Sequence, residues 1–466
     1  MIPTTKDDTT FDNNNKEMPF TSDQIFDAIR NAQGDTPFHL YNGDMIAENA
    51  RHMIKSFRNH FTHYTNYFAV KATPNPHLLD LLKQQGMGVD CSSFAELILS
   101  QKVGFKGDEI MFTSNNTPDK EYQLAYELGA VINLDDITQI DAMKQALGGE
   151  KMPRMVSLRY NPGPLKQGNA IIGEPQEAKF GLTAAQLPEA YAKLKALGVD
   201  RFGLHCMVAS NELQLDYFEE TAKLLFNTVA ELSRSPMSLT FEMINLGGGI
   251  GIPYRPGQKP VDFVQLAQRI ANQYNNIILP LLSDQQQYVN ANIKEIKIVT
   301  ECGRVVTGPY GCLITKAIHH KSTYKQYVGV DACMVNLMRP GMYGAYHHIT
   351  VLKQNNQNNQ NNQNNQNNNN LYDIVGSLCE NNDKFAVNRS LPNIEKGDIL
   401  VIHDSGAHGH SMGFNYNGKT RSAEYLFTTT NNNNNETKTF TCIRRGETLD
   451  DLFTTLDFSK WDNKDL

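Results

Sequence analysis

The chain has 466 residues, of which 40% are hydrophobic and 20% are charged, and its formal net charge is -7 at pH 7. This length predicts one large globular domain plus a second one, and the composition is that of an ordinary folded protein. The acidic balance argues against a nucleic-acid partner, because phosphate binding depends on basic patches. No apolar run approaches the length that spans a bilayer, so we expect no membrane partner.

The N-terminal segment, residues 1–18, has early acidic residues and lacks the apolar stretch of a secretory signal. We interpret it as a disordered tail. The seven cysteines are scattered and form no C-x-x-C pair. This pattern predicts reduced thiols, no structural zinc and a cytoplasmic protein. We also predict no metal site near Asp404, where His403, His408 and His410 alternate along a strand and loop.

The order of the predicted elements divides the chain into two domains. Residues 1–40 contain the tail and the start of a strand-like run, PFHLYN, which we assign to a β domain. Residues 41–305 alternate between helix-like and strand-like patterns, and residues 306–466 contain mainly short β-type runs. The expected fold class is therefore α/β, with a (β/α)8 barrel of the TIM type followed by a C-terminal all-β domain.

Eight strand-like runs alternate with helix-like ones in the first domain, which is typical of a parallel barrel. Ser93 and Glu96 form a capping-box pattern before one helix. Gly86, Gly104 and Gly129 are expected to end three helices. The predicted strands are YFAVKA (67–72), GVDCS (88–92), EIMFTS (109–114), AVINLD (130–135), MVSLRYN (155–161), FGLHCMV (202–208), MINLGGG (243–249) and EIKIVTECG (295–303).

Two tracts rich in asparagine and glutamine interrupt the β-type region, at residues 354–370 and 431–435. Neither tract contains apolar residues that could join a core. Each lies between strand-like runs. We therefore interpret both tracts as exposed, disordered insertions that lengthen hairpin turns.

Functional groups gather at the predicted ends of the barrel strands, where barrel enzymes carry their catalytic residues. Lys71 ends the first run, although the residues before it, YFAV, are apolar. A triple glycine, Gly247–Gly249, ends the seventh run, and Glu301 ends the eighth. The other groups at strand ends are Asp90, Ser114, Arg159, Asn161, His205 and Arg304.

Together these groups favour pyridoxal phosphate chemistry over a lysine that reaches solvent without a function. Such chemistry needs a lysine for the Schiff base, a phosphate cradle and an acid beside the pyridine nitrogen. A glycine turn lets backbone N–H groups approach an anion, because no Cβ intervenes. Alone, the glycines would fit a tight turn without a ligand equally well. With Lys71 and Glu301 they complete the set.

Longer motifs resemble those of a known family. YFAVKAT, VDCSSFAELI, NLGGGIGIPY and ECGR are similar to the alanine-racemase-type, fold III pyridoxal-phosphate decarboxylases. RPGMYGAYHHI, VGSLCENNDKF and GAHGHSMGFNYNGKTRSAEYLF narrow the resemblance to the diaminopimelate decarboxylases, from about residue 35 to about residue 455. It implies conversion of meso-2,6-diaminopimelate to L-lysine and carbon dioxide, the last step of lysine biosynthesis. It also implies a homodimer with active sites at the interface.

The same resemblance assigns roles to individual residues. Lys71 is the Schiff-base lysine, and Glu301 pairs with the ring nitrogen. Cys379, from the β domain of the other subunit, is the proton donor. The other residues implied to hold the cofactor are Ser210, Gly247, Gly248, Gly249, Gly303, Arg304 and His408. Those implied to bind the substrate are Arg304, His408, Glu380 at its amine, and Arg339 and Tyr343 at its distal end.

Three positions depart from the family pattern. The family's EPGR reads ECGR here, which keeps the glutamate and the arginine. Met207 stands where a histidine usually stacks on the cofactor ring, and a thioether can also pack on such a ring. His408 stands where a tyrosine normally reaches phosphate and substrate, and imidazole can donate a hydrogen bond there. Tyr416 is the alternative donor.

Two other functions stay open at this point. A fold III decarboxylase for ornithine, arginine or carboxynorspermidine would share the cofactor residues. A basic substrate needs a carboxylate in the distal pocket, whereas the second carboxylate of diaminopimelate suits Arg339. The other alternative is a catalytically inactive regulatory homologue, which the presence of Lys71, Glu301 and Cys379 disfavours.

Overall fold

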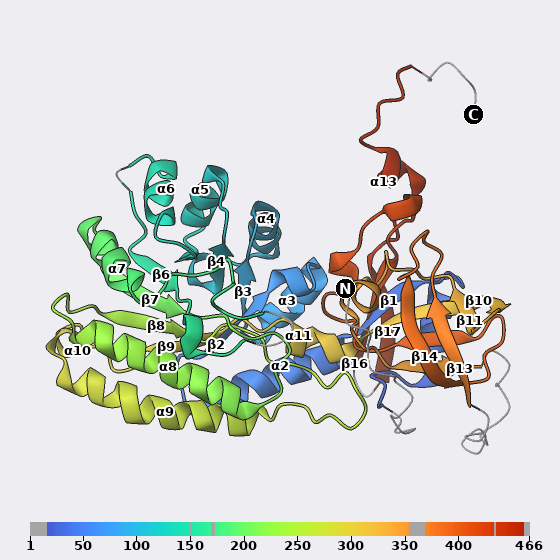
Figure 1. Cartoon of the computed structure of the whole chain (residues 1–466), viewed down its shortest axis with the longest axis horizontal. Helices are drawn as coiled ribbons and strands as arrows, with labels where there is room; N and C mark the ends of the chain where they lie inside the picture. Colours follow the sequence, from blue (N-terminus) through green and yellow to red (C-terminus); the bar gives the residue numbers. More distant parts are fainter. Residues whose placement is uncertain (1–15, 150, 169–172, 354–368, 433–434, 461–466) are drawn as a thin grey trace. The chain divides into compact units, whose positions relative to one another are not determined.

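The computed structural model, shown in Figure 1, describes residues 16–149, 151–168, 173–353, 369–432 and 435–460. Most of the predicted N-terminal tail therefore lies outside the described residues. The chain divides into two compact units. Unit 1 comprises Met1–Asp44, Tyr254–Gln258 and Thr307–Leu466, and unit 2 comprises Met45–Pro253 and Lys259–Val306.

Unit 2 contains a closed barrel of parallel strands, with helices around it (Figure 1). The strands pair in chain order, and the first pairs with the last to close the barrel. The predicted fold class is confirmed, because all eight predicted runs are barrel strands. They span Thr65–Ala69 (β2), Gly88–Cys91 (β3), Ile110–Ser114 (β4), Val131–Leu134 (β5), Met155–Arg159 (β6), Arg201–His205 (β7), Phe241–Asn245 (β8) and Lys297–Thr300 (β9).

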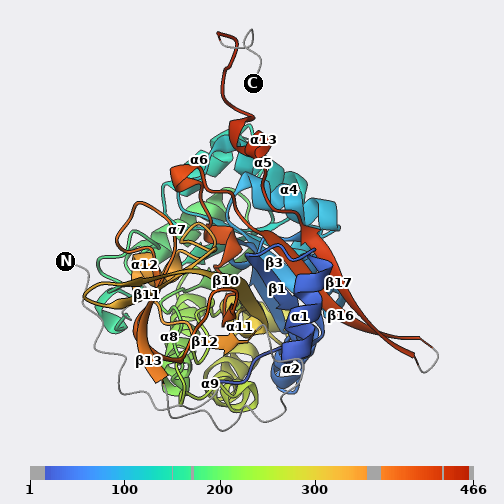
Figure 2. The same cartoon turned by 90° about the vertical axis from the view of Figure 1, so that its right-hand side faces the viewer.

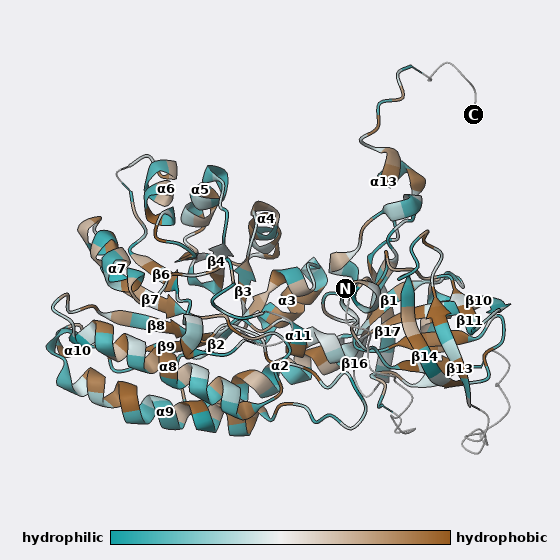
Figure 3. Cartoon of the chain, in the orientation of Figure 1, coloured by the Kyte–Doolittle hydropathy of each residue, from teal (hydrophilic) through white to brown (hydrophobic). Residues whose placement is uncertain are grey.

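Helices of unit 2 bury apolar side chains, such as Leu78, Leu79 and Leu82 of α3. The two longest, α8 and α9, alternate between hydrophobic and hydrophilic residues (Figure 3). Tyr274 of α9 packs edge-on against Phe226 of α8, with ring centroids 5.7 Å apart. The helices are Gly43–Arg58 (α2), Pro76–Gln84 (α3), Phe94–Val103 (α4), Asp119–Glu127 (α5), Gln139–Ala146 (α6), Gln186–Ala196 (α7), Leu215–Arg234 (α8), Phe263–Asp284 (α9), Gln286–Asn290 (α10) and Arg304–Thr307 (α11).

The predicted helix boundaries near α4 are confirmed in part. Gly104 ends α4 in the left-handed region, with φ 93°. Ser93 Oγ accepts the N–H of Glu96 at 3.4 Å, as the capping box predicts. The Glu96 carboxylate, however, accepts the N–H and the hydroxyl of Ser92, at 2.6 and 2.9 Å. The reciprocal half of the predicted box is therefore displaced by one residue, because the chain turns at Ser92 directly after β3.

Unit 1 is built on a nine-stranded sheet in which β1 is central. β1, Phe38–Asn42, pairs antiparallel with β10 and parallel with β16. Helix α1, Ser22–Asn31, covers β1 through Ile25 and Ala28 (Figure 2). The other elements are Gly311–Ser322 (β10), Gln326–Val330 (β11), Arg339–Tyr343 (α12), Ile349–Leu352 (β12), Asn369–Val375 (β13), Lys384–Pro392 (β14), Ile399–Ile402 (β15), Ala423–Asn432 (β16), Asn435–Arg444 (β17) and Leu449–Phe453 (α13).

The two asparagine-rich tracts lie partly outside the described residues, which omit 354–368 and 433–434. Residues 369–370, at the end of the first tract, begin β13. In the second tract, Asn432 of β16 pairs with Asn435 of β17. The prediction of loop is wrong for these residues, because strand pairing uses backbone groups and needs no apolar side chain.

No helix within the described ranges is both long enough and apolar enough to cross a membrane.

Candidate active site

Lys71 lies at the C-terminal end of the barrel. It follows β2 in a single 3-10 turn, Val70–Ala72, and its side chain is exposed. The residues on either side of it, Val70 and Ala72, are buried. The turn therefore fixes where the lysine side chain begins and leaves its amine accessible.

Glu301 is a buried carboxylate with two nitrogen partners. Asn245 Nδ2 donates to Oε1 at 2.6 Å, and His205 Nε2 lies 3.1 Å from Oε2. Burial by itself raises the pKa of Glu301, but the charge and hydrogen bond of His205, the hydrogen bond of Asn245 and the charge of Lys71 lower it to about 2. Glu301 is therefore ionised at neutral pH.

His205 is held on its other side by Asn133. The Nδ2 atom of Asn133 lies 2.7 Å from Nδ1 of His205 and 3.4 Å from Thr113 Oγ1. Both His205 and Asn133 are only 1% exposed. Three buried side chains, Asn133, His205 and Glu301, thus form a line across the barrel end.

The pKa of a second buried carboxyl, Asp90 of β3, is shifted in the opposite direction. Its Oδ1 atom has no hydrogen-bond partner among the described residues. Burial and then the negative charge of Glu301 raise the pKa of Asp90 well above its ordinary value, against the opposing charge of Lys71. Two carboxyls whose pKa values are shifted in opposite directions therefore lie near the same lysine, and such pairs divide acid and base roles in enzymes.

The triple glycine folds onto the neighbouring strand ends. A Cβ at Gly247 would lie 2.3 Å from the carbonyl oxygen of Cys206, and one at Gly248 would lie 2.5 Å from that of Glu301. Gly249 has φ 93°, and its Cβ would lie 2.4 Å from the carbonyl oxygen of Ala209. Contacts within the protein therefore suffice to require glycine here, and the anion cradle stays a prediction.

Met207 lies against this loop. The N–H of Gly248 is directed at Met207 Sδ, with 3.2 Å between nitrogen and sulfur. The N–H of Gly247 donates to Asn245 Oδ1 at 2.9 Å. Because a thioether is a weak acceptor, an anionic oxygen would be a better partner for the Gly248 N–H than the sulfur is.

The remaining predicted cofactor residues of unit 2 lie at the same barrel end. Gly303 approaches the lysine turn so closely that a Cβ on it would lie 2.7 Å from Cβ of Ala72. Arg304 begins α11 and is half-buried, and Ser210 is half-buried in the loop after β7. The structure therefore brings the lysine, the carboxylate, the glycines, the arginine and the serine to one rim.

The predicted substrate residues of unit 1 include Arg339, which is 7% exposed at the start of α12. Its Nη1 donates to Tyr254 Oη at 2.6 Å and lies 3.2 Å from His347 Nε2. The guanidinium also lies over the Tyr254 ring, 4.8 Å from the centroid. Tyr343 ends α12 and is exposed. Arg339 is therefore held in place by a phenol and an imidazole.

Cys379 and Glu380 are exposed in the loop between β13 and β14 of unit 1. The N–H of Cys379 donates to Asn417 Oδ1 at 2.8 Å. The negative charge of Glu380 and its hydrogen bond raise the pKa of Tyr416. Cys379 and Glu380 of this loop therefore lie near Tyr416 of a later segment, so that a thiol, a carboxylate and a phenol come together.

Asp383 ties this loop to the α12 region. Its Oδ2 accepts the N–H of Leu378 at 2.8 Å, and its Oδ1 accepts the N–H of Met334 at 2.7 Å. A Cβ at Gly341 would lie 2.5 Å from the carbonyl oxygen of Asn382, so α12 and the loop are in close contact. The predicted substrate residues of unit 1 thus come from two adjoining segments.

His408, the replacement for the usual tyrosine, is half-buried in unit 1 with φ 55°. Its left-handed backbone is uncommon for a non-glycine residue. The described parts of the chain contain no group of three or more His, Cys, Asp or Glu side chains arranged to hold a metal ion.

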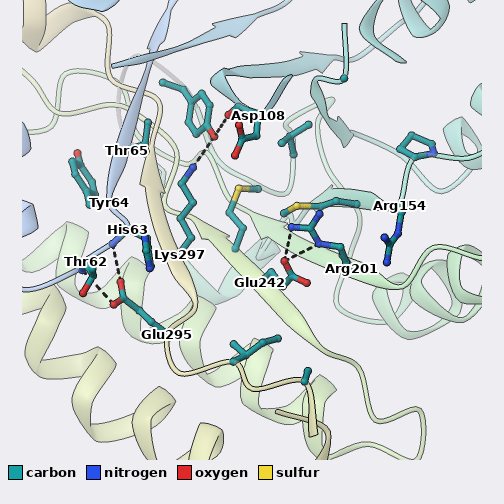
Figure 4. A pocket seen from close by; sticks show the side chains of 18 of the residues that line it. Thr62, His63, Tyr64, Thr65, Asp108, Arg154, Arg201, Glu242, Glu295 and Lys297 are labelled. Carbon is teal, nitrogen blue, oxygen red and sulfur yellow. Dashed lines mark hydrogen bonds and ion pairs between the residues drawn. The ribbon is translucent and has the colours of Figure 1, made fainter. Parts of the chain in front are cut away.

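A cavity of about 1360 Å³ lies at the opposite, N-terminal end of the barrel (Figure 4). Arg201 pairs there with Glu242, with 2.6 Å between Nη2 and Oε2. Lys297 Nζ donates to Tyr67 Oη at 3.1 Å. None of the predicted site residues lines this cavity, so the candidate site is at the other end.

The sequence left three of these residues without a role: Asn133, Asn245 and Asp383. The two asparagines are polar residues within the apolar strand runs AVINLD and MINLGGG. A buried amide must be hydrogen-bonded, so their position was a usable signal. Asp383 gave no such signal, because its partners are backbone N–H groups that are distant along the chain.

Comparisons with known proteins give matches over most of the chain. Residues 47–308 match the family described as "Pyridoxal-dependent decarboxylase, pyridoxal binding domain". Protein TabA of Pseudomonas amygdali pv. tabaci is 38% identical over 416 residues, which cover 89% of this chain and 90% of that protein. The diaminopimelate decarboxylase of Methanothermobacter thermautotrophicus is 30% identical over 415 residues, covering 88% of this chain and 91% of that protein.

Solved structures give the same picture. Diaminopimelate decarboxylase from M. jannaschii in co-complex with L-lysine is 28% identical, with a TM-score of 0.79, and the match covers 92% of this chain and 94% of that one. A mutant diaminopimelate decarboxylase from Helicobacter pylori complexed with L-lysine is 25% identical, with a TM-score of 0.77 and coverage of 93% and 98%. The likeness therefore includes both units.

Proposed function

This chain belongs to the pyridoxal-dependent decarboxylases, and we propose that it converts meso-2,6-diaminopimelate to L-lysine and carbon dioxide, the last step of lysine biosynthesis. Family membership makes it a carboxy-lyase whose cofactor is pyridoxal 5'-phosphate. The relatives named diaminopimelate decarboxylase support the substrate. The observation that carries it is the buried Arg339, because a guanidinium suits the second carboxylate that distinguishes this substrate from basic amino acids.

The barrel end fits this cofactor. Lys71 would hold it covalently through its accessible amine. The ionised Glu301 would accept a hydrogen bond from the protonated ring nitrogen. The Gly248 N–H, now directed at a thioether, is suited to a phosphate oxygen. The other residues that we expect to hold it are Ser210, Gly247, Gly249, Gly303, Arg304 and His408. Once bound, the cofactor supplies a ring that takes up the electron pair released when carbon dioxide leaves.

We assign the remaining steps to residues of unit 1. The Cys379 thiol would donate a proton to the α-carbon after carbon dioxide has left. The Glu380 carboxylate would accept a hydrogen bond from the substrate amine, and Tyr343 would contact the distal end with Arg339. Both Cys379 and Glu380 are exposed, which agrees with their use by a second subunit. We therefore propose a homodimer with shared active sites, acting in the cytoplasm.

The test is carbon dioxide release from diaminopimelate, ornithine, arginine and lysine. We expect turnover of diaminopimelate alone. In Arg339→Ala, the loss of a charge-assisted contact should lower kcat/KM for diaminopimelate about 30- to 1,000-fold, equal to about 2–4 kcal/mol. Arg339→Lys should restore only part of this loss, because an ammonium lacks the planar fork.

Cofactor absorbance serves as the control in this test, since Arg339 lies outside the cofactor residues and both variants should bind the cofactor normally. An Arg339→Ala enzyme with the original kcat/KM would show that another residue recognises the distal carboxylate. Preferred turnover of ornithine or arginine would replace the substrate proposal altogether.

A different amino acid is the second candidate substrate. The relative named TabA is 38% identical to this chain, whereas the diaminopimelate decarboxylases that we compared are 30% identical or less. The name TabA states no activity. If the purified enzyme carries the cofactor but releases no carbon dioxide from any of the four amino acids, this candidate is favoured.

A further inference from the structure

Asn133, His205 and Glu301 form a line of buried side chains at the C-terminal end of the barrel, where the candidate site lies. Asn133 comes from β5, His205 from β7, and Glu301 follows β9, so three separate strands contribute. The two contacts along the line are 2.7 Å, from Asn133 to His205 Nδ1, and 3.1 Å, from His205 Nε2 to Glu301. Each residue is at most 8% exposed, so water competes little for these contacts.

The partners fix where the imidazole carries a proton. The Glu301 carboxylate is ionised and can only accept a hydrogen bond, so the Nε2 atom that faces it must carry hydrogen. Asn133 presents its amide nitrogen to Nδ1, which then acts as acceptor. Rotating the amide by 180° would turn Nδ1 into a donor and would still leave hydrogen on Nε2. Both amide orientations therefore leave hydrogen on Nε2, the nitrogen that lies 3.1 Å from Oε2 of Glu301.

The surroundings make this donor valuable. Asn245 occupies Oε1 of Glu301 at 2.6 Å, so the two oxygens each have one nitrogen partner. Glu301 also interacts electrostatically with Lys71, Asp90, Tyr67 and Cys302. Asp135 interacts with His205 and pairs with Arg159 at 3.1 Å. Without His205, Glu301 would lie buried with a carboxyl neighbour, Asp90, and one amide.

We propose that His205, fixed by Asn133, is a positioning residue that holds the Glu301 carboxylate ionised and aimed at the ring nitrogen of the cofactor. This inference rests on the part of the proposed function that gives Glu301 that partner. It does not depend on the identity of the substrate. The imidazole of His205 acts on the cofactor only through Glu301.

The first variants distinguish the effect of hydrogen-bond donation by His205 from the effect of the shape of its ring. His205→Leu removes the donor, whereas His205→Gln keeps an N–H that can reach the position of Nε2. Asn133→Leu keeps the imidazole and removes its support. Tyr288→Phe is the matched control, because it also removes buried hydrogen bonds of unit 2, to Ser233 and to the N–H of Phe241.

The readout is binding of pyridoxal phosphate to apoenzyme, followed by fluorescence quenching between pH 6 and 9, with the absorbance spectrum of the bound cofactor. Leaving one oxygen of a buried carboxylate without a nitrogen partner should weaken cofactor binding about 10- to 100-fold in His205→Leu, and Asn133→Leu should show a smaller loss. His205→Gln should stay within about threefold of the original protein. Tyr288→Phe should leave the affinity, the pH profile and the spectrum unchanged.

A double variant tests whether the effect passes through Glu301. In Glu301→Gln the acceptor is uncharged, so adding His205→Leu should weaken binding no further. Independent, additive losses in the double variant would overturn the proposal. So would a His205→Gln protein as weak as His205→Leu, because that result would mean that ring shape matters and donation does not.

The two proposals can fail separately. If Glu301→Gln binds the cofactor with unchanged affinity and spectrum, the expected partner of the ring nitrogen is wrong, and this inference fails with it. If the variants behave as expected but diaminopimelate is not turned over, only the substrate proposal fails. Measuring cofactor binding therefore keeps the two outcomes apart.

Discussion

The two ends of the barrel differ in how their charged side chains are buried and paired. At the C-terminal end, Glu301 and Asp90 are buried, and Glu301 is stabilised mainly by a histidine and an amide. At the N-terminal end, Arg201 pairs with Glu242, and their side chains are 44% and 28% exposed. Burial makes the first arrangement sensitive to every neighbour, whereas solvent screens the second.

This contrast shows why cavity size alone does not locate the site. The cavity at the N-terminal end is lined by the Arg201–Glu242 ion pair and by Arg154, which pairs with Asp200, and these four side chains are between 28% and 77% exposed. The C-terminal end brings together an ionised carboxylate, a second buried carboxyl whose pKa is raised, and an exposed lysine. At the C-terminal end the pKa values of two buried carboxyls, Glu301 and Asp90, are shifted in opposite directions, and carboxyl pairs of this kind mark functional sites.

The largest expected difference between the ends concerns their lysines. Lys71→Ala should lower kcat/KM on the order of 10³-fold or more and abolish the absorbance of covalently bound cofactor, because its amine is the proposed attachment point. Lys297→Met, at the other end, should keep both properties. Steady-state kinetics and an absorbance scan of the two purified variants check this pair. Covalent cofactor in Lys71→Ala would place the attachment elsewhere.

A second difference concerns the glutamates. Glu301→Gln should lower kcat about 100- to 1,000-fold, because the charge opposite the ring nitrogen is lost. Glu242→Gln, in the cavity at the N-terminal end, should stay within about twofold of the original enzyme. Both changes are isosteric, so packing is matched. Equal losses in the two variants would mean that the ends do not differ as described.

The same two glutamates should differ in their contribution to acid stability. The pKa of Glu301 is lowered in the folded protein from 4.5 to about 2. Its ionised form therefore stabilises the fold above pH 4.5, and this contribution is lost as the pH falls from 4.5 towards 2. Urea unfolding at pH 7 and pH 4 should show a smaller drop in the free energy of unfolding for Glu301→Gln than for Glu242→Gln. Identical drops would contradict the pKa assignment.

The smallest effect is expected for the ion pair at the N-terminal end. Arg201→Ala should lower the free energy of unfolding by about 0.2–1 kcal/mol, as for other exposed pairs, and the effect should shrink in high salt. Activity should not change. Urea unfolding in low and high salt measures both quantities. A loss above about 3 kcal/mol would show that the pair is effectively buried.

The sequence was sufficient for the barrel because its strands are locally marked. Runs such as GVDCS and EIMFTS are short, contain apolar residues and are followed by helical patterns, and each became a strand of unit 2. The polar strand pairing at Asn432 and Asn435 was missed, since composition says nothing about backbone pairing. The displaced bond of Glu96 was missed because one residue of turn geometry decides it.

The residues of the candidate site that lie at strand ends were predicted from the sequence, but the contacts that hold them in place were not. Lys71 and Glu301 could be placed at strand ends from the sequence alone. The line from Asn133 through His205 could not, because these residues are 72 positions apart and meet only when the barrel closes. Likewise, the contact of Arg339 with Tyr254 joins residues 85 positions apart. Distant partners of this kind are decided by the fold and leave no local pattern.

The central position of β1 has a consequence for how the protein is made. β1 begins at residue 38, and its neighbours β10 and β16 begin at residues 311 and 423. A ribosome adding 5–20 residues per second needs roughly 14–55 s to synthesise the first neighbour after β1 has appeared. During that time the apolar strand has no partner, while the strands of unit 2 are synthesised between them. The nascent chain must therefore keep β1 from wrong contacts until the sheet of unit 1 can be completed.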